Sequence, residues 1–430
     1  MPRRLATGEA GFAAAFEDLV NSKRETETEV GDVVAAIIAA VIEGGDSALI
    51  GYTRRFDRFD PAETGLAIGA AEIEAAVARI DPETRAALEL AAERIESFHA
   101  RQLPTDFEIN DPAGLRLGLR WTSIDAVGLY VPGGTAAYPS SVLMNAMPAK
   151  VAGVSRRVMV VPTPDGVVND LVLAAARIAG ITEIWRIGGA QAVAALAYGT
   201  ESIAKVDKIV GPGNAYVAAA KRMVFGLVGI DSIAGPSELT VVAGDENRAD
   251  WTAADLLSQA EHDPMAQSIL VTDSEAFADR VEEEIARLLP VLGEGSAAPE
   301  SLETNGAIVL CERADVPDIV GLIAPEHVEL AISEGAEMAA RIKHAGAIFV
   351  GPWACEALGD YLTGSNHVLP TSGAARFMSG LSTADFMKRI SIQEISRTGF
   401  EGIAASAETL ANCEGLPAHA LSVSVRRGAL

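Results

Sequence analysis

The sequence predicts an α/β fold built on parallel strands, and three observations support that prediction. From Ala126 onward, short β-branched runs alternate with alanine-rich stretches of helical period, which is the pattern of βαβ units. Two glycine-rich turns each follow a candidate strand, Val131-Pro-Gly-Gly-Thr135 and Gly211-Pro-Gly-Asn214. Hydrophobic residues make up 49% of the 430 residues and charged residues 22%, so the chain is expected to fold around a large core, with roughly three domains' worth of sequence.

Residues 1 to about 105 are expected to be helical, because apolar positions recur there every three or four residues. The helices predicted in this part span 11–19, 30–42, 71–80 and 84–101. Short strands are then expected, each followed by a helical stretch. They span 158–161, 184–187, 208–210, 239–242, 268–271, 307–310 and 347–350.

The pattern changes again after Pro370. A turn-rich segment over 371–380 precedes predicted helices over 386–398 and 404–414, and a strand-like run over 421–425 ends the tail. This tail is too small to fold independently. We therefore expect it to pack on another part of the protein.

Composition excludes several classes of partner. The formal charge is 34 basic minus 59 acidic residues, or −25, and a polyanionic surface repels nucleic-acid phosphates and anionic lipid headgroups. The strongest apolar run, 33–42, is shorter than the roughly 18–20 residues of a membrane span, and acidic residues interrupt any signal peptide. Three distant cysteines indicate neither disulfides nor a thiolate cage. We expect a cytoplasmic protein whose metal ligands, if any, are His, Asp, Glu or amide groups.

Histidines are the most informative polar residues, because they transfer protons at neutral pH and bind metals. His99 and His344 lie in charged helical stretches and are interpreted as surface residues. Gln259 and His262 are spaced i, i+3 at a helix end, where both could reach one ion, although such a histidine is more often a cap or an exposed group. Glu326 and His327 precede a strand-like run. They are either a general acid/base pair or solvated residues at a strand start.

A glycine-bearing segment after a predicted strand, 359–370, contains Asp360, Asn366 and His367. Loops at strand ends are where α/β sheets place their sites, but an Asp and an Asn there can also simply cap turns. His419 is near the C-terminus, and its spacing says nothing more. The turns ending at Gln191 and Asn214 pass from strand to helix and could face a phosphate, but neither is a GxGxxG. The residues alone indicate a soluble α/β enzyme with a possible His/Asp metal site.

Longer motifs make the chain recognisable. The segment Val127-Gly-Leu-Tyr-Val-Pro-Gly-Gly-Thr-Ala-Ala-Tyr-Pro-Ser-Ser-Val-Leu-Met-Asn-Ala-Met-Pro-Ala-Lys150 resembles the signature of the histidinol dehydrogenase family. Other motifs of that family follow in the same order: Ile187-Gly-Gly-Ala-Gln-Ala, Lys208-Ile-Val-Gly-Pro-Gly-Asn-Ala-Tyr216, Ala234-Gly-Pro-Ser-Glu238, Ser258-Gln-Ala-Glu-His262, Ala324-Pro-Glu-His327, Asn366-His-Val-Leu-Pro370 and Glu414-Gly-Leu-Pro-Ala-His419. The resemblance extends from the N-terminal helices to the tail.

The resemblance implies a fold of two incomplete Rossmann-like domains, one inserted in the other, with small helical terminal segments that pack across a homodimer. On this sequence the main catalytic domain would be 26–129 with 239–380, and the inserted NAD-binding domain 130–238. An N-terminal helical segment, 1–25, and a C-terminal dimerisation tail, 381–430, would complete the protomer.

The resemblance also implies an activity: the NAD-dependent, zinc-dependent oxidation of L-histidinol through L-histidinal to L-histidine with two NAD+, the last steps of histidine biosynthesis. The implied ligands of one zinc per subunit are Gln259, His262, Asp360 and His419, with zinc acting mainly to orient the substrate. His327 would take the alcohol proton, and Glu326 would activate the water that hydrates the aldehyde.

The remaining implied positions bind substrate and cofactor. Ser237, His327, His367, Glu414 and the four zinc ligands would contact substrate, and His419 and Glu414 would come from the other protomer. The NAD positions are Tyr130, Gln191 and Asn214. Two alternatives stay open: a related zinc and NAD enzyme for another polar alcohol, such as a sulfonated diol, and a catalytically inactive zinc-binding homologue. Glu414 and the stretch 379–389 favour histidinol, and intact Glu326 and His327 argue against an inactive protein.

Overall fold

The computed structural model describes residues 1–21, 30–62, 64–133, 138–233 and 235–428. Parts of two sequence motifs, at 134–137 and 234, lie outside these residues. The chain separates into two compact units. Unit 1 comprises 1–102 with 125–386, and unit 2 comprises 103–124 with 387–430.

Unit 1 contains a five-stranded parallel sheet with the order β6-β5-β4-β7-β8. Its elements follow one another as β4 (Ala126–Tyr130), α5 (Pro139–Val151), β5 (Arg156–Val160), α6 (Asp170–Ile178), β6 (Glu183–Trp185), α7 (Gly189–Tyr198), β7 (Lys208–Val210), α8 (Ala215–Val224) and β8 (Gly229–Ile230). The chain runs outward from β4 in one direction and then in the other. The strand order therefore reverses between β4 and β7, whose carboxyl ends flank the usual ligand crevice of such a sheet.

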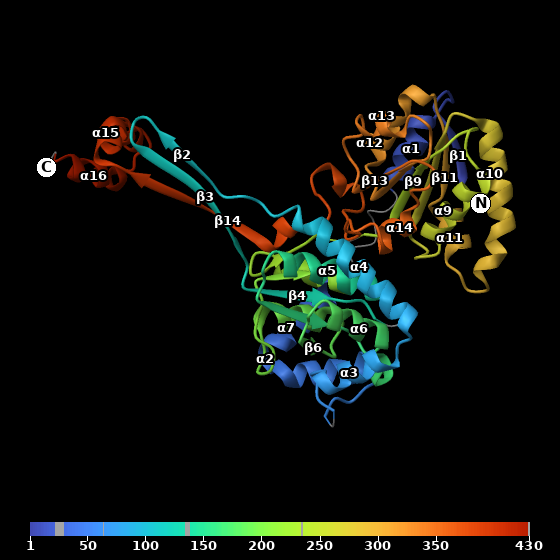
Figure 1. The fold of residues 1–430 in the computed structure, drawn as a ribbon, viewed down its shortest axis with the longest axis horizontal. Coiled ribbons are helices and arrows are strands. Elements are labelled where there is room, and N and C mark those ends of the chain that lie inside the picture. The colour runs from blue at the N-terminus through green and yellow to red at the C-terminus, as the bar shows by residue number, and fades with distance from the viewer. Residues whose placement is uncertain (22–29, 63, 134–137, 234, 429–430) are drawn as a thin grey trace. The chain divides into compact units, whose positions relative to one another are not determined.

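Three helices from the N-terminal part accompany this sheet (Figure 1): α2 (Gly31–Phe56), α3 (Ala70–Arg79) and α4 (Pro82–Ala100). Helix α2 is long and apolar enough to cross a membrane by length and composition alone. However, Gly45 has φ 49° and ψ −131° and divides it into two segments, 31–44 and 46–56, each shorter than the roughly 20 residues that a bilayer requires. Val34, Ile37 and Val41 join the core of the five-stranded sheet, so this helix belongs to the folded core.

A second parallel sheet in unit 1 has six strands in the order β1-β11-β10-β9-β12-β13. Its successive elements are β9 (Glu238–Val242), α9 (Ala249–Ala260), β10 (Gln267–Thr272), α10 (Glu275–Leu288), α11 (Ala298–Thr304), β11 (Ala307–Leu310), α12 (Val316–Ile323), β12 (His327–Leu330), α13 (Gly335–Ala339), β13 (Ala347–Val350) and α14 (Glu356–Tyr361). From β9 to β13 the strand order is the same as in the first sheet. The reversal here falls between β9 and β12.

All seven strands predicted from the sequence coincide with observed strands, as β5, β6, β7, β9, β10, β11 and β13. The prediction that the first hundred residues are entirely helical was wrong. Strand β1 (Arg3–Ala6) precedes α1 (Phe12–Asn21) and extends the six-stranded sheet by pairing with β11, from Arg3 opposite Ala307 to Ala6 opposite Leu310. A four-residue edge strand has no periodicity of its own, and its partner lies 300 residues away in the sequence.

Unit 2 consists of an antiparallel sheet and two helices. The sheet has the order β14-β3-β2 and contains β2 (Phe107–Asp111), β3 (Leu115–Ser123) and β14 (Met387–Ile395), followed by α15 (Arg397–Cys413) and α16 (Pro417–Ser424). Figure 1 shows the long β3 and β14 strands side by side. The helix predicted over 386–398 was therefore wrong, because Ile390 and Ile392 alternate with polar residues at the period of a strand. The strand predicted over 421–425 was also wrong, since α16 covers most of it.

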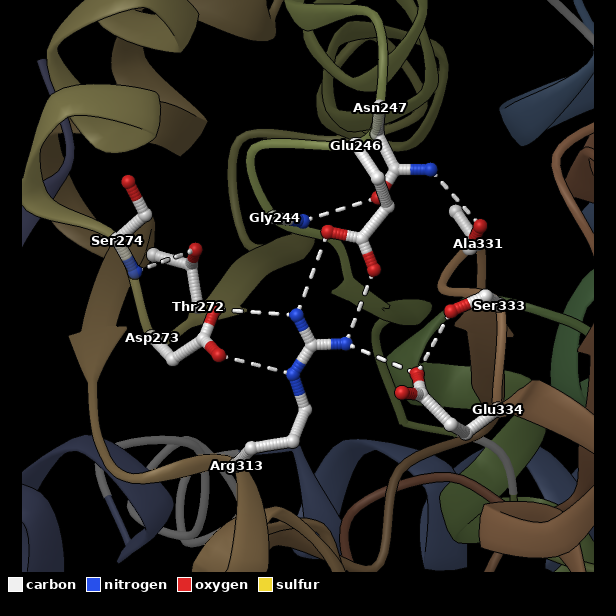
Figure 2. A network of polar contacts seen from close by, with 10 residues as sticks. All are labelled: Gly244, Glu246, Asn247, Thr272, Asp273, Ser274, Arg313, Ala331, Ser333 and Glu334. Atoms are coloured by element: carbon white, nitrogen blue, oxygen red, sulfur yellow. Dashed lines mark hydrogen bonds and ion pairs between the residues drawn. The ribbon is translucent and has the colours of Figure 1, made fainter.

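One arginine connects the segments that follow the carboxyl ends of β9, β10, β11 and β12 in the six-stranded sheet (Figure 2). Arg313, after β11, contacts Glu246 after β9 at 3.0 Å, Asp273 after β10 at 2.9 Å and Glu334 after β12 at 3.3 Å. Asn247 adds a 2.8 Å hydrogen bond to the carbonyl of Ala331. In an open α/β sheet this edge is the usual place for a nucleotide. Here a network of side chains occupies it.

We expect Arg313→Met to lower the free energy of unfolding by about 1 kcal/mol, because three neighbouring, solvent-exposed carboxylates lose their shared counter-charge. Differential scanning calorimetry should show the lower melting temperature, and added salt should reduce the deficit by screening the carboxylates. Arg287→Met, which breaks one helical ion pair on α10, is the matched control and should change stability by no more than about 0.5 kcal/mol. Equal melting temperatures for the two variants would contradict this role of Arg313.

Candidate functional site

Glu326 and His327 lie at the amino end of β12 in the six-stranded sheet, beside Glu238, which begins the neighbouring strand β9. Glu326 accepts a 3.0 Å hydrogen bond from the backbone N–H of Glu238, and the Nδ1 of His327 lies 3.3 Å from the carbonyl oxygen of Glu238. Both side chains are buried, with 5% and 4% of their surface exposed. The alternative that these residues are solvated at a strand start is therefore excluded. The pair lies at the edge of the sheet opposite to the Arg313 network.

Helix α14 brings two carboxyl groups to His327. The Nδ1 of His327 lies 3.4 Å from Oε1 of Glu356, and its Nε2 lies 3.7 Å from Oδ1 of Asp360. Possible ligand atoms of these three residues all lie within 4.8 Å of one another, so they could hold a metal ion. His367 is next to them, with its Nδ1 3.8 Å from Oδ1 of Asp360.

Two details of this group correct the sequence interpretation. Asp360 lies within helix α14 and not in a loop. Glu356 was not predicted at all, although its spacing from Asp360, four residues on a helix, places the two on one face. That spacing was the available signal, but nothing in the sequence indicated that 356–361 is helical.

Gln259 and His262 meet at the end of α9, as their spacing predicted. The Nε2 of Gln259 lies 3.1 Å from the Nδ1 of His262. Gln259 is fully buried, and its Oε1 has no hydrogen-bond partner among the described residues. His262 also affects the other imidazoles, since its charge would lower the pKa of both His327 and His367. Gln259, His262 and Asp360 therefore face one region of the protein.

Burial dominates the electrostatics of this region. It lowers the pKa of His327 to about 3 and that of His367 to about 4, so both imidazoles are neutral at pH 7. It raises the pKa of Asp360 to about 7, and it raises that of Glu356 well above its usual range, with the nearby charges of Asp360 and Glu326 adding to the effect. The region thus concentrates nitrogen and oxygen donors, which is an environment suited to a cation.

The donor set also fits a zinc ion chemically. Imidazole nitrogens with carboxylate or amide oxygens are ordinary zinc ligands. The unpartnered Oε1 of Gln259 is a donor that the fold leaves available. Two sets of donors share Asp360: one adds Gln259 and His262, and the other adds His327 and Glu356.

The other predicted substrate positions are distributed over both units. Ser237 directly precedes β9, and its carbonyl accepts a 3.0 Å hydrogen bond from the N–H of Gln267. Glu414 follows the last residue of α15 and His419 lies in α16, so both belong to unit 2, where both are exposed. The placement of these two residues at the site stays a prediction.

The three predicted NAD residues follow strands of the five-stranded sheet or end them. Tyr130 ends β4, and its buried hydroxyl accepts a 2.9 Å hydrogen bond from the N–H of Gly189 at the start of α7. Gln191 is buried in the first turn of α7, and its Oε1 finds no hydrogen-bond partner in the described part of the chain. Asn214 caps α8 by accepting hydrogen bonds from the N–H groups of Tyr216 and Val217.

The turn before Asn214 is held rigidly. Gly211 has φ +113°, and an added Cβ would overlap the carbonyl oxygen of Tyr130, so this position requires glycine. Asp231 accepts a 2.7 Å hydrogen bond from the N–H of Gly211, and Lys221 donates a 3.1 Å hydrogen bond to its carbonyl. Lys221 and Asp231 also form a buried ion pair. A fixed turn of this kind at a helix start can present N–H groups to a phosphate.

His99 corrects another expectation. It was interpreted as a surface residue but is completely buried, and its Nδ1 lies 2.8 Å from the carbonyl of Ile95. Its Nε2 lies 3.4 Å from Nδ2 of Asn366, which donates a 2.7 Å hydrogen bond to the carbonyl of Met144. Since Asn366 precedes His367, His99 helps to fix the segment that brings His367 to the site.

Comparisons with known proteins agree along the whole chain. The family model described as histidinol dehydrogenase matches residues 20–427. The sequence is 58% identical to the histidinol dehydrogenase of Rhodospirillum rubrum over 428 residues and 54% identical to that of Brucella suis over 427, covering 99% of each chain in both cases. The crystal structure of histidinol dehydrogenase from Elizabethkingia anophelis matches with a TM-score of 0.94 at 34% identity, covering 100% of this chain and 98% of that one.

We expect His99 to favour the folded state less as the pH falls below about 6.5, so that the difference in stability between the wild type and His99→Gln changes over this range. Burial lowers the pKa of His99 below its ordinary value. Its contribution to stability is therefore complete above the pKa of the unfolded chain and is lost as the pH falls toward the lower pKa of the folded state. Melting temperatures measured between pH 7.5 and 5.5 test this. Parallel curves for the wild type and the variant would contradict it.

Proposed function

The chain belongs to the histidinol dehydrogenase family, and we propose that it oxidises L-histidinol through L-histidinal to L-histidine with two NAD+. It is an NAD-dependent oxidoreductase of histidine biosynthesis. The single observation that best supports the proposed chemistry is the buried Glu326–His327 pair, which lies directly beside the candidate metal donors.

We propose Gln259, His262 and Asp360 as the zinc ligands of one chain, with His419 contributed by the other. The alternative set would use His327, whose Nε2 is needed as a base. The free Oε1 of Gln259 supports the first set. A zinc ion held there would supply orientation and positive charge for the polar substrate.

His327 is suited to accept the alcohol proton. Its Nδ1 is directed at the Glu238 carbonyl, which favours the tautomer with the proton on Nδ1 and leaves Nε2 free. As the substrate carbon transfers a hydride to the nicotinamide, Nε2 would take the hydroxyl proton and yield the aldehyde. Glu326 would then remove a proton from the water that adds to the aldehyde, and a second hydride transfer from the hydrate would give the carboxylic acid.

We place NAD at the carboxyl edge of the five-stranded sheet, near Tyr130, Gln191 and Asn214. In this proposal the NAD domain is Rossmann-like and is built on the five-stranded sheet. It extends beyond the predicted bounds of 130–238, because β4 begins at Ala126 and α2 packs in the core of that sheet. The six-stranded sheet forms the other, main domain. The reversal of strand order between β4 and β7, followed by the fixed Gly211 turn, supports this placement. Ser237 and His367 would contact substrate from the main domain.

We also propose a homodimer in which segment 381–430 packs across the interface. The same expectation for segment 1–25 does not fit the fold, because β1 pairs with β11 of its own sheet and Phe16 and Leu19 of α1 join the core of that sheet. Within the described part of unit 2, large apolar side chains are exposed on the antiparallel sheet: Phe107, Ile109, Leu117, Ile390 and Ile392. Apolar surface of this extent favours a protein partner. A second copy would cover it and bring its Glu414 and His419 to the site. We expect no nucleic-acid or membrane partner, and a cytoplasmic location.

The purified enzyme should release two molecules of NADH for each L-histidinol consumed, because the aldehyde is oxidised again after hydration. Absorbance at limiting substrate measures this ratio. A sulfonated diol should yield no NADH. Oxidation of the diol in place of histidinol would favour the alternative substrate, and no turnover of either would favour the inactive zinc-binding homologue.

The shared site predicts complementation between two inactive variants. His327→Ala destroys the base of its own chain, whereas His419→Asn damages only the tail lent to the other chain. In a mixed dimer one of the two sites is intact, so random exchange should restore about a quarter of wild-type activity. NADH production after co-expression tests this. Activity no higher than that of either parent would reject the shared site.

A further inference from the structure

Two acidic side chains next to the site, the buried Glu329 and the partly buried Asp255, have no part in the proposed chemistry. Glu329 lies on β12 two residues after His327, so both project from the same face of the strand. Asp255 lies on α9 four residues before Gln259 and seven before His262, and is therefore on the helix face that bears both. Only 4% of the surface of Glu329 is exposed.

Glu329 connects β12 to α14. Its Oε1 accepts a 2.6 Å hydrogen bond from the backbone N–H of Glu356, the first residue of α14. The residue before the helix, Cys355, gives no side-chain cap. Glu329 therefore supplies, from the neighbouring strand, an acceptor that a capping residue would otherwise provide.

Asp255 connects α9 to the same carboxyl group. The side chains of Asp255 and Glu329 are hydrogen-bonded to each other, which requires that the two carboxyl groups share a proton. One pair of side chains thus joins α9, β12 and α14.

We propose that Asp255 and Glu329 form a carboxyl clamp that sets the spacing of Gln259 and His262 on α9 from Asp360 on α14. The clamp touches neither substrate nor metal, so both members are positioning residues. This inference depends on the zinc ligands proposed above. Groups that orient metal ligands from behind typically change metal affinity by 10- to 100-fold when they are removed.

The test measures zinc affinity by chelator competition at pH 7.5 on the full-length protein. Glu329→Leu removes the acceptor and should weaken zinc binding by about 10- to 100-fold. Glu329→Gln should stay within about threefold of the wild type, because its amide oxygen can accept from Glu356 and its amide nitrogen can donate to Asp255. Zinc binding by Glu329→Leu equal to that of the wild type would overturn the clamp.

Val328→Ala is the matched control for a general loss of stability. Val328 lies between His327 and Glu329 on β12 but faces the hydrophobic core, so its truncation should lower the melting temperature without changing zinc affinity. An equal loss of zinc affinity in Val328→Ala and Glu329→Leu would show that the effect is merely structural and overturn the proposal.

Three further variants keep the test decisive. If Glu329→Leu fails to fold, Asp255→Ala should weaken zinc binding about tenfold. Asp255→Asn can still donate to Glu329 and should bind zinc as the wild type does. Equal zinc affinities of Asp255→Ala and Asp255→Asn would overturn the clamp. His262→Asn tests the ligand set itself and should lose zinc. Retention of zinc by His262→Asn would reject the proposed ligands. If His262→Asn loses zinc but Glu329→Leu binds it normally, only the clamp is rejected.

Discussion

Burial of ionisable groups is the constraint on which this site depends. His327, Glu356 and Asp360 converge where β12 and α14 meet, and desolvation keeps the imidazole neutral while it favours the protonated carboxyl groups. Such a cluster costs folding free energy unless hydrogen bonds fix its members and a cation compensates for them. The N–H groups of Glu238 and Glu356 supply part of that fixation, since each donates to a buried glutamate. The rest of the stabilisation is what a bound metal would provide.

The two parallel sheets share one strand order, but the proposed functional residues lie at opposite edges, at the carboxyl ends of the strands in the first sheet and at an amino end in the second. In the five-stranded sheet, the residues proposed for NAD follow the carboxyl ends of the strands, as the general rule for open α/β sheets predicts. In the six-stranded sheet the corresponding edge is bridged by Arg313 and its acidic partners, and the proposed catalytic pair, Glu326 and His327, lies at the amino end of β12. The same topology thus carries the proposed cofactor site at the carboxyl edge of one sheet and a network of ion pairs at that edge of the other.

Positioning in this protein is achieved largely by groups that do not react. Asn366 fixes the segment before His367 through contacts with His99 and Met144. Lys221 and Asp231 hold the Gly211 turn from both sides. Because buried polar groups must be satisfied, each of these contacts also constrains the backbone that presents a proposed ligand-binding residue.

The sequence by itself determined the parallel α/β class, seven strands and the pairing of Gln259 with His262, because each depends on local period or on spacing within one helix. It also indicated the Glu326–His327 pair, but not whether the pair was buried. Tertiary structure decided what depends on distant partners. Segments β1 and β14 are strands because residues about 300 and 270 positions away supply their hydrogen bonds. His99 is buried because α4 packs against the segment of Asn366, and Glu356 reaches His327 only because α14 folds over β12. Local sequence fixes periodicity, whereas burial and long-range pairing arise from the whole chain.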